Sequence, residues 1–301
     1  MKIILALVAG IAALGATIAA AGCGGNDASG ARDDEQQVVA AFYPLAYATE
    51  RVAGDGVEVT NLTPPGTEPH DVELSPRSVE RVRFADLVLL LGGGFQPSLE
   101  RAAEDVDGTV LDLLQGLRLR EPVEEQAEED EHAEKVDSDP HVWLDPVRYS
   151  RIAGRIADAI PGASAKVLQR NLTELDREFR NGLARCDRRT IVTSHAAFGY
   201  LAERYGLEQV PIAGLSPEAE PTPQHLEQIV RDVRTTGATT IFFETLVSPR
   251  LAETVARETG AKTAVLNPIE GLTPDQADEG EDYLSLMREN LVSLRKALGC
   301  H

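Results

Sequence analysis

Residues 87–91 form an uninterrupted apolar run, Leu-Val-Leu-Leu-Leu, and three glycines follow it directly. A run of this kind is typical of a strand buried on both faces, as in a parallel sheet covered by helices. Further strands are expected at 37–42, 57–62 and 110–113, and helices at 45–52, 95–103, 146–160 and after Ser75. This alternation of strand and helix predicts an α/β fold with a parallel sheet.

The same alternation starts again near residue 190. Strands are expected at 190–193, 209–212, 240–243 and 263–266, and helices at 196–205, 223–237, 249–259 and 282–298. Residues 163–186, between the two series, follow no strand and carry apolar side chains at helical spacing. We therefore expect two lobes, each a parallel sheet flanked by helices, joined by one long rigid helix. The expected boundaries are 38–160, 161–187 for the linking helix, and 188–301.

The first 37 residues are not expected to belong to the lobes. Lys2 precedes an uncharged, mostly apolar stretch that ends at Gly22, as in a secretory signal peptide. Cys23 follows small residues, so the stretch resembles a bacterial lipoprotein signal in which 1–22 is removed and Cys23 is lipidated. The alternative is an uncleaved anchor, because about 20 apolar residues can span a bilayer. Both interpretations place the rest of the chain outside the cytoplasmic membrane, with 23–37 as a flexible tether.

The formal net charge is −20, and no basic stripe is present, which speaks against nucleic acid as a partner. Part of the charge is local, because residues 121–139 contain ten acidic residues, one lysine and His132. This loop can be a solvated surface insertion or a weak electrostatic funnel for cations.

Two cysteines, Cys186 and Cys300, remain after Cys23. Outside the cytoplasm, two cysteines in one folded unit are expected to form a disulfide, which would fix the C-terminal end to the lobe that contains Cys186. The alternative is two free buried thiols.

Three of the six histidines lie in short segments held by prolines or by a strand end, namely His70, His141 and His195. Their spacings of about 70 and about 55 residues are too wide for a local zinc motif. Neutral imidazole is the commonest metal ligand, and open α/β sheets bind ligands beyond the carboxyl ends of their strands. We predict that these three side chains meet at a metal site in the cleft between the lobes. His225 and His301 have no comparable context.

Two glutamates just past strand ends compete for a fourth ligand position. Glu270 lies on a proline-stiffened loop, whereas Glu244 follows an apolar strand and could instead hydrogen-bond to a ligand. We favour Glu270 as the ligand. The second ring nitrogen of His141 has two candidate acceptors, Asp139 and Asp145.

The chain resembles the zinc- and manganese-binding lipoproteins that serve metal-importing ABC transporters, over nearly all of its mature length. The segments that carry the resemblance are Ala-Phe-Tyr-Pro at 41–44, Glu-Pro-His-Asp-Val-Glu-Leu-Ser-Pro at 68–76, Asp-Pro-His-Val-Trp-Leu-Asp-Pro at 139–146, Ser-His-Ala-Ala-Phe-Gly-Tyr-Leu at 194–201 and the terminal helix at 283–298. The resemblance implies two α/β lobes joined by a rigid helix, with His70, His141 and His195 at the family's first three ligand positions.

The fourth ligand position varies among the proteins that the chain resembles. Many of them carry aspartate where this chain has Asn267, but residues 266–273, Leu-Asn-Pro-Ile-Glu-Gly-Leu-Thr, resemble a zinc-binding subgroup whose glutamate supplies the ligand. The resemblance therefore implies Glu270 at this position. Three histidines with water or Asn267 are the alternative.

Three imidazoles and one carboxylate suit tetrahedral Zn²⁺, whereas the family's manganese sites have two histidines and two carboxylates. The resemblance implies a lipid-anchored, monomeric protein that captures Zn²⁺ and delivers it to an ABC permease, without catalysis. The alternatives are a manganese importer, a metal-dependent surface adhesin, and a zinc hydrolase with Glu244 or Glu270 as base. No His-Glu-x-x-His motif supports the last of these.

Overall fold

The computed structural model describes residues 35–54, 56–122, 136–217 and 221–301. The expected signal peptide, the lipidation site Cys23, most of the tether and His132 lie outside these residues. Within the described chain, none of the helices combines the length and hydropathy that a membrane span requires.

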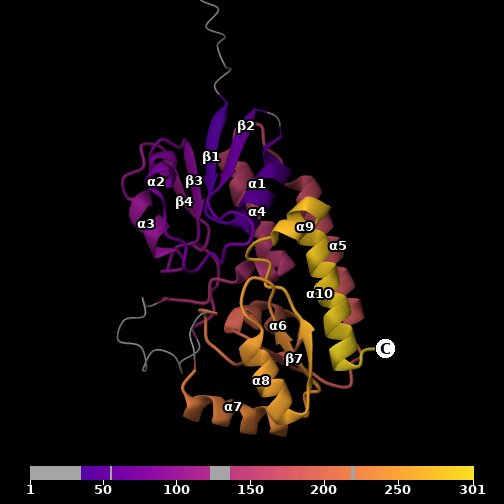
Figure 1. The fold of residues 1–301 in the computed structure, drawn as a ribbon. Helices are drawn as coiled ribbons and strands as arrows, with labels where there is room; N and C mark the ends of the chain where they lie inside the picture. Colours follow the sequence, from indigo (N-terminus) through magenta and orange to yellow (C-terminus); the bar gives the residue numbers. More distant parts are fainter. Residues whose placement is uncertain (1–34, 55, 123–135, 218–220) are drawn as a thin grey trace, which may run out of the picture. The chain divides into compact units, whose positions relative to one another are not determined.

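The N-terminal lobe contains a four-stranded parallel sheet with strand order β2-β1-β3-β4 (Figure 1). Its strands are β1 (Gln36–Ala40), β2 (Val57–Asn61), β3 (Leu87–Leu90) and β4 (Thr109–Asp112). Its helices are α1 (Tyr43–Ala53), α2 (Pro76–Arg83), α3 (Pro97–Ala103), η2 (Val142–Leu144) and α4 (Pro146–Ala159). Every residue of β3 is buried, as its apolar run predicts. Helix α2 begins where expected, because the Ser75 side chain accepts a hydrogen bond from the backbone N–H of Ser78.

The C-terminal lobe repeats this arrangement, with parallel strands in the order β6-β5-β7-β8. Its strands are β5 (Thr190–Thr193), β6 (Glu208–Pro211), β7 (Thr240–Phe243) and β8 (Lys262–Val265). Its helices are η3 (Ala196–Phe198), α6 (Gly199–Tyr205), α7 (Pro223–Thr236), α8 (Arg250–Thr259), α9 (Pro274–Glu279) and α10 (Tyr283–Leu298). The predicted fold class is confirmed. In each sheet the strand order reverses between the two central strands, β1 and β3 in the first and β5 and β7 in the second. In parallel sheets a ligand crevice lies at such a point, beyond the carboxyl ends of the strands.

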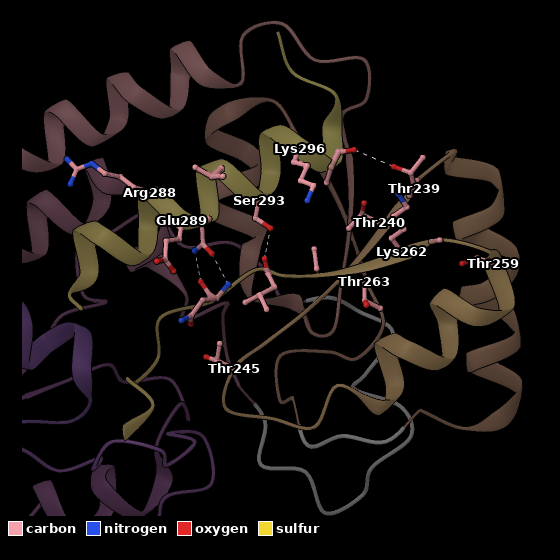
Figure 2. Close-up of a pocket in the computed structure, with 18 of the residues that line it drawn as sticks. Thr239, Thr240, Thr245, Thr259, Lys262, Thr263, Arg288, Glu289, Ser293 and Lys296 are labelled. Atoms are coloured by element: carbon pink, nitrogen blue, oxygen red, sulfur yellow. Dashed lines mark hydrogen bonds between the residues drawn. The ribbon is translucent and has the colours of Figure 1, made fainter. Parts of the chain in front are cut away.

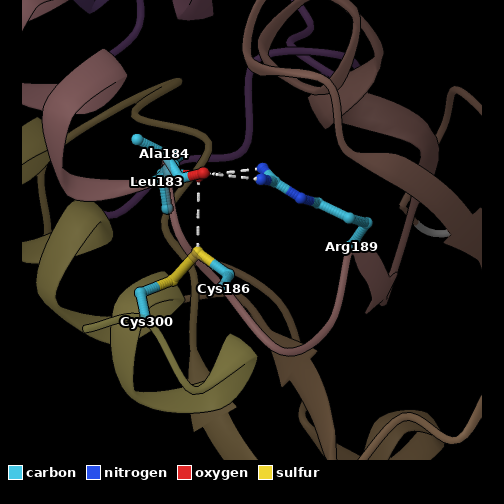
Figure 3. Close-up of a disulfide and its surroundings, with 5 residues drawn as sticks. All are labelled: Leu183, Ala184, Cys186, Arg189 and Cys300. Carbon is cyan, nitrogen blue, oxygen red and sulfur yellow. Dashed lines mark hydrogen bonds between the residues drawn. A yellow bond between two sulfur atoms is a disulfide. The ribbon is translucent and has the colours of Figure 1, made fainter.

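The helix expected at 163–186 is shorter in the structure, where α5 covers Lys166–Gly182. Gly162 has a positive φ of 79°, which breaks the chain before the helix. At the other end, the Arg189 guanidinium donates to the carbonyls of Leu183 and Ala184 at 2.8 and 3.0 Å (Figure 3). These bonds satisfy carbonyls that a longer helix would use, so the helix stops there.

Helix α5 is the expected joining helix, and α10 packs beside it (Figure 1). The Cys186–Cys300 disulfide, predicted from the sequence, closes the C-terminal end of the pair (Figure 3). At the other end, the Asp282 carboxylate caps α10 and accepts hydrogen bonds from Arg51 and Tyr47 of α1, at 3.0 and 3.3 Å. Helix α10 is therefore attached to both lobes.

The main apolar core is shared between the lobes. It extends from the first sheet through α4, α5 and α10 to Phe198, Phe242 and Ile269 of the second lobe. A smaller core lies between the second sheet and helices α7 and α8. The segment that carries Glu270 is thus packed into the interior that both lobes build.

A surface pocket of about 980 Å³ lies between the edge strand β8 and α10 (Figure 2). Thr263 and Lys262 line it from β8, and Lys296 lines it from α10. The Ser293 hydroxyl of α10 donates to the Val265 carbonyl at 2.6 Å and so ties the helix to the end of the strand.

Candidate metal centre

One nitrogen each from His70, His141 and His195 and one oxygen from Glu270 lie within 4.8 Å of one another. His70 is on the loop after β2, His141 directly precedes η2, His195 lies between β5 and η3, and Glu270 is on the loop after β8. Four separate segments, two from each lobe, therefore supply the cluster. The structure brings together all four residues that the sequence suggested as ligands.

The cluster is compact and closed. Glu270 Oε1 lies 3.1 Å from His141 Nε2 and 3.5 Å from both His70 Nε2 and His195 Nε2. The Nε2 atoms of His141 and His195 are 3.3 Å apart. The four side chains are between 0 and 7 % exposed, so solvent hardly reaches the point that they surround.

The carboxylate of Asp139 fixes the orientation of His141. Its Oδ1 lies 2.9 Å from His141 Nδ1 and also accepts the backbone N–H of His141 at 3.0 Å. Because Nδ1 is occupied in this way, Nε2 is the nitrogen that faces the cluster. The backbone of Asp139 is fixed as well. Its N–H donates to the Arg120 carbonyl, and the Asp139 carbonyl accepts a hydrogen bond from the Tyr200 hydroxyl.

Asp145, the other candidate partner of His141, has a different role. Its carboxylate accepts the backbone N–H of Val147 at the start of α4 and lies within 2.5 Å of Arg148 and 3.2 Å of Arg204. Both ring nitrogens of His141 already face Asp139 and Glu270. Of the two candidate acceptors, the structure thus places Asp139 beside the second ring nitrogen of His141 and Asp145 at the start of α4.

The Glu244 carboxylate fixes His195 in the same manner. Glu244 Oε1 lies 2.6 Å from His195 Nδ1 and also accepts a hydrogen bond from the Ser194 hydroxyl. The His195 carbonyl accepts from Thr193 Oγ1 at 2.7 Å and from Gln209 Nε2 at 3.0 Å. Glu244, at the end of β7, thus contacts a cluster histidine without belonging to the cluster.

His70 is held by Glu68 and by an aromatic wall. Glu68 Oε2 accepts the backbone N–H of His70 at 2.9 Å. The Phe95 ring meets the imidazole edge-on, with ring centroids 4.7 Å apart, and also packs against Phe42 and Trp143. The sequence predicted for Phe95 only a place in a helix, and only its position directly after the three glycines that follow β3 could have suggested a role at the site.

Asn267 does not point a free oxygen at the cluster. Its Oδ1 accepts the backbone N–H of Ile269 at 2.8 Å, two residues further along the loop. This is a local turn in which the amide oxygen is used by the backbone. The alternative in which Asn267 replaces Glu270 has no support in this geometry.

Charge in the cluster is distributed unevenly. Burial alone would raise the pKa of Glu270, but hydrogen bonds to the three histidines hold it well below its ordinary value. Burial opposes protonation of His195, yet Glu244 and Glu270 raise its pKa well above the usual range. Asp139 and Glu270 likewise raise the pKa of His141 against the effect of burial. For His70 burial prevails and its pKa is lowered. The carboxylate therefore favours its ionised form, and His141 and His195 hold a proton more readily than His70 does.

A second carboxyl lies close by in a different state. Burial, followed by repulsion from Glu270, raises the pKa of Glu68 to about 9. Glu68 is thus a neutral acid at pH 7, and Glu270 supplies the negative charge.

Comparisons with known proteins agree on one family. The family described as "Zinc-uptake complex component A periplasmic" matches residues 38–297. The high-affinity zinc uptake system protein ZnuA of Bacillus subtilis is 34 % identical over 297 residues, which cover 92 % of this chain and 93 % of that protein. The zinc-binding lipoprotein AdcA of Streptococcus pneumoniae is 35 % identical over 88 % of this chain, and this chain spans 56 % of its length.

Solved structures show the same fold. The Zn(II)-bound ZnuA-like domain of Streptococcus pneumoniae AdcA superposes with a TM-score of 0.71 at 33 % identity, covering 88 % of this chain and 99 % of that one. The laminin-binding protein Lmb of Streptococcus agalactiae, described as bifunctional with adhesin and metal-transporting activity, gives 0.75 at 29 % identity, covering 87 % and 99 %. With the family match over residues 38–297, these similarities show that the chain belongs to the family of periplasmic zinc-uptake component A proteins.

Proposed function

We propose that this protein captures Zn²⁺ outside the cytoplasmic membrane and delivers it to an ABC permease for import. The observation that carries the proposal is the spacing of the four candidate ligand atoms, which all lie within 4.8 Å of one another and in four pairs are 3.1 to 3.5 Å apart. A tetrahedral Zn²⁺ with bonds of about 2.0–2.1 Å requires ligand atoms about 3.3–3.4 Å apart. These four separations are therefore close to those of a tetrahedral zinc site.

Binding would use the Nε2 atoms of His70, His141 and His195 and one oxygen of Glu270. Each imidazole must be neutral to bind, so protons leave the cluster as the cation enters. Asp139 and Glu244 would keep the Nδ1–H of their histidines and so present the Nε2 lone pair to the ion. These two carboxylates also offset the positive charge that Glu270 alone leaves on a buried Zn²⁺.

The donor set favours zinc over manganese. Three nitrogens and one oxygen suit Zn²⁺, whereas Mn²⁺ prefers oxygen ligands and more of them. The relatives point the same way, since ZnuA of Bacillus subtilis is a zinc uptake protein and AdcA a zinc-binding lipoprotein. Zn²⁺ is cargo in this proposal.

Catalysis is not part of the proposal. A catalytic zinc keeps one position open for water, but four protein atoms here fill a tetrahedral shell that solvent hardly reaches. The family consists of transport components, which agrees with a binding role.

The N-terminal sequence supports a proposal about where the protein is located in the cell. We propose that residues 1–22 are a signal peptide, that lipid on Cys23 anchors the protein at the outer face of the cytoplasmic membrane, and that 23–37 tethers the lobes 38–160 and 188–301. Mass spectrometry of the purified membrane form tests this, because Cys23→Ser should abolish the added lipid mass.

Metal content and affinity test the binding proposal. The chain without residues 1–22 is purified, its metals are measured by mass spectrometry, and zinc affinity is measured by competition with a chromophoric chelator. We expect one Zn²⁺ per chain, and a large loss of affinity in Glu270→Ala and His195→Ala but not in His225→Ala on α7. Unchanged affinity in both site variants would contradict the proposed ligands.

Growth tests the delivery proposal. Cells that lack this protein should grow poorly when a chelator limits zinc, and added zinc, but not added manganese, should restore growth. The Glu270→Ala variant should fail to complement the deletion.

A further inference from the structure

The residue before Glu270 has an unusual backbone. Among the described residues, Ile269 is the only non-glycine with a positive φ, 58°. A β-branched side chain in this left-handed region is a steric outlier, and such a conformation persists only where the surroundings fix it. Ile269 is also fully buried. Something in the fold must therefore hold the loop against its local preference.

Asn290 on α10 makes the contacts that do so. Its Oδ1 accepts the backbone N–H of Asn267 at 2.8 Å, and its Nδ2 donates to the carbonyl of the same residue at 2.6 Å. Both side chains are buried, with 2 % and 4 % exposure. Asn267 Oδ1 in turn accepts the Ile269 N–H at 2.8 Å. A chain of hydrogen bonds thus runs from α10 to the residue that precedes the carboxylate.

A further contact fixes the middle of the loop. Trp143 Nε1 donates to the Pro268 carbonyl at 2.7 Å, from the segment that carries His141. Helix α10 itself is a fixed support, because Asp282 attaches it to α1 and the Cys186–Cys300 disulfide attaches its other end. The loop is therefore held from two sides, by α10 and by the segment that follows His141.

We propose that Asn290 is a positioning residue for the Glu270 ligand. By holding both backbone groups of Asn267, it enables the Asn267 turn and the left-handed Ile269, which aim Glu270 Oε1 between the three imidazoles. The expected effect of Asn290 on zinc affinity rests on the proposed function. Without this support, the strained Ile269 relaxes and the carboxylate loses the sub-ångström placement that a metal site requires.

The first experiment needs no metal. Hydrogen exchange in the metal-free protein is measured by mass spectrometry for a peptide that covers 266–271. Asn290→Ala should speed exchange there, because the Asn267 and Ile269 amides lose their fixed acceptors. Ser293→Ala is the matched control, since it removes another α10 bond to the same segment, at Val265, and should leave exchange at 267 and 269 unchanged. Unchanged exchange in Asn290→Ala overturns the proposal.

The second experiment separates positioning from general support. Zinc affinity is compared for Asn290→Ala in the natural background and in Glu270→Gln. We expect a loss of roughly 10- to 100-fold in the first, the range for residues that orient metal ligands, and less than about 3-fold in the second, since Asn290 acts through the carboxylate. Equal losses in both backgrounds, or no loss in either, overturn the proposal.

Asn290→Ser keeps a polar group too short to hold both backbone atoms, and it replaces Asn290→Ala in both experiments if the alanine variant does not fold. If the natural protein binds no zinc, the proposed function fails, whereas the exchange experiment still decides whether Asn290 holds the loop.

Discussion

Glu244 and His195 meet at the carboxyl ends of the two central strands of the second sheet, with Glu244 Oε1 2.6 Å from His195 Nδ1. This contact sets which ring nitrogen faces the cluster, and it joins residues that are 49 positions apart in the sequence. Because parallel strands end at a common edge, the pairing is a direct product of the topology.

Replacing Glu244 by glutamine should weaken zinc binding by roughly 10- to 100-fold, because the charged acceptor that orients His195 is lost. Competition titration measures the effect. Glu227→Gln is the control, since Glu227 is an exposed residue of α7. Equal affinities for the two variants would show that Glu244 does not support the site.

Zinc affinity should fall as the pH is lowered. The pKa values of His195 and His141 are raised by their carboxylate partners, so both rings hold a proton more tightly than a free imidazole does. Zinc must displace these protons, and calorimetry in buffers of different ionisation enthalpy should detect their release. Equal affinity at pH 5 and pH 7.5 would contradict this.

The same shifts predict how metal-free stability depends on pH. A raised histidine pKa stabilises the folded state fully below the unfolded value near 6.5, and this contribution is lost as the pH rises through the folded pKa. The lowered pKa of Glu270 acts in the opposite sense, and its contribution is lost as the pH falls below the unfolded value. We therefore expect His195→Ala to destabilise the metal-free protein less at high pH than at pH 6. Urea unfolding of the variant and the natural protein at both pH values measures this difference.

Gly199→Ala should weaken zinc binding without disturbing the core. An added Cβ would lie 2.7 Å from Arg120 Nε and 2.8 Å from Asp139 Oδ2. The long Arg120 side chain can move away, but Asp139 cannot move without releasing His141, so we expect a loss of about tenfold. Gly154→Ala in α4 is the control, because its Cβ meets only the end of the Gln169 side chain. Similar zinc affinities for the two variants would count against the role of Asp139.

Removing the disulfide should lower stability and spare affinity. The double change Cys186→Ala and Cys300→Ala opens a loop of 114 residues, and we expect a loss of about 2–5 kcal/mol in the free energy of unfolding. Urea unfolding of the natural protein and the double variant measures this loss. The natural protein with its disulfide reduced should show a similar loss. A parallel loss of zinc affinity would show that the end of α10 must be closed for the site to form.

Much of the fold was predictable because the apolar run of β3 and the helix starts at Ser75 and Thr222 are local signals. The histidine positions were predictable for a related reason, since strand ends in a parallel sheet converge. Helix α9 was not expected, although Thr273 and Gln276 form a capping box that marks its start.

Other features depend on packing that no local pattern encodes. Asp145 and Asp139 are both aspartates next to proline, and only the structure separates the helix cap from the partner of His141. Asn290 resembles any polar residue of an exposed helix until α10 is placed against β8. Nothing in the sequence indicates that the Arg120 guanidinium lies beside the Asp139 carboxylate, with Nε 3.6 Å from Oδ2.

The shared apolar core has a consequence for cooperativity. Phe198, Phe242 and Ile269 of the second lobe are buried in an interior that the first lobe completes, so neither lobe has a full interior when the other is unfolded. The two lobes should therefore melt as one unit. An ion bound between them then stabilises the entire chain, by an amount that grows with the logarithm of its free concentration.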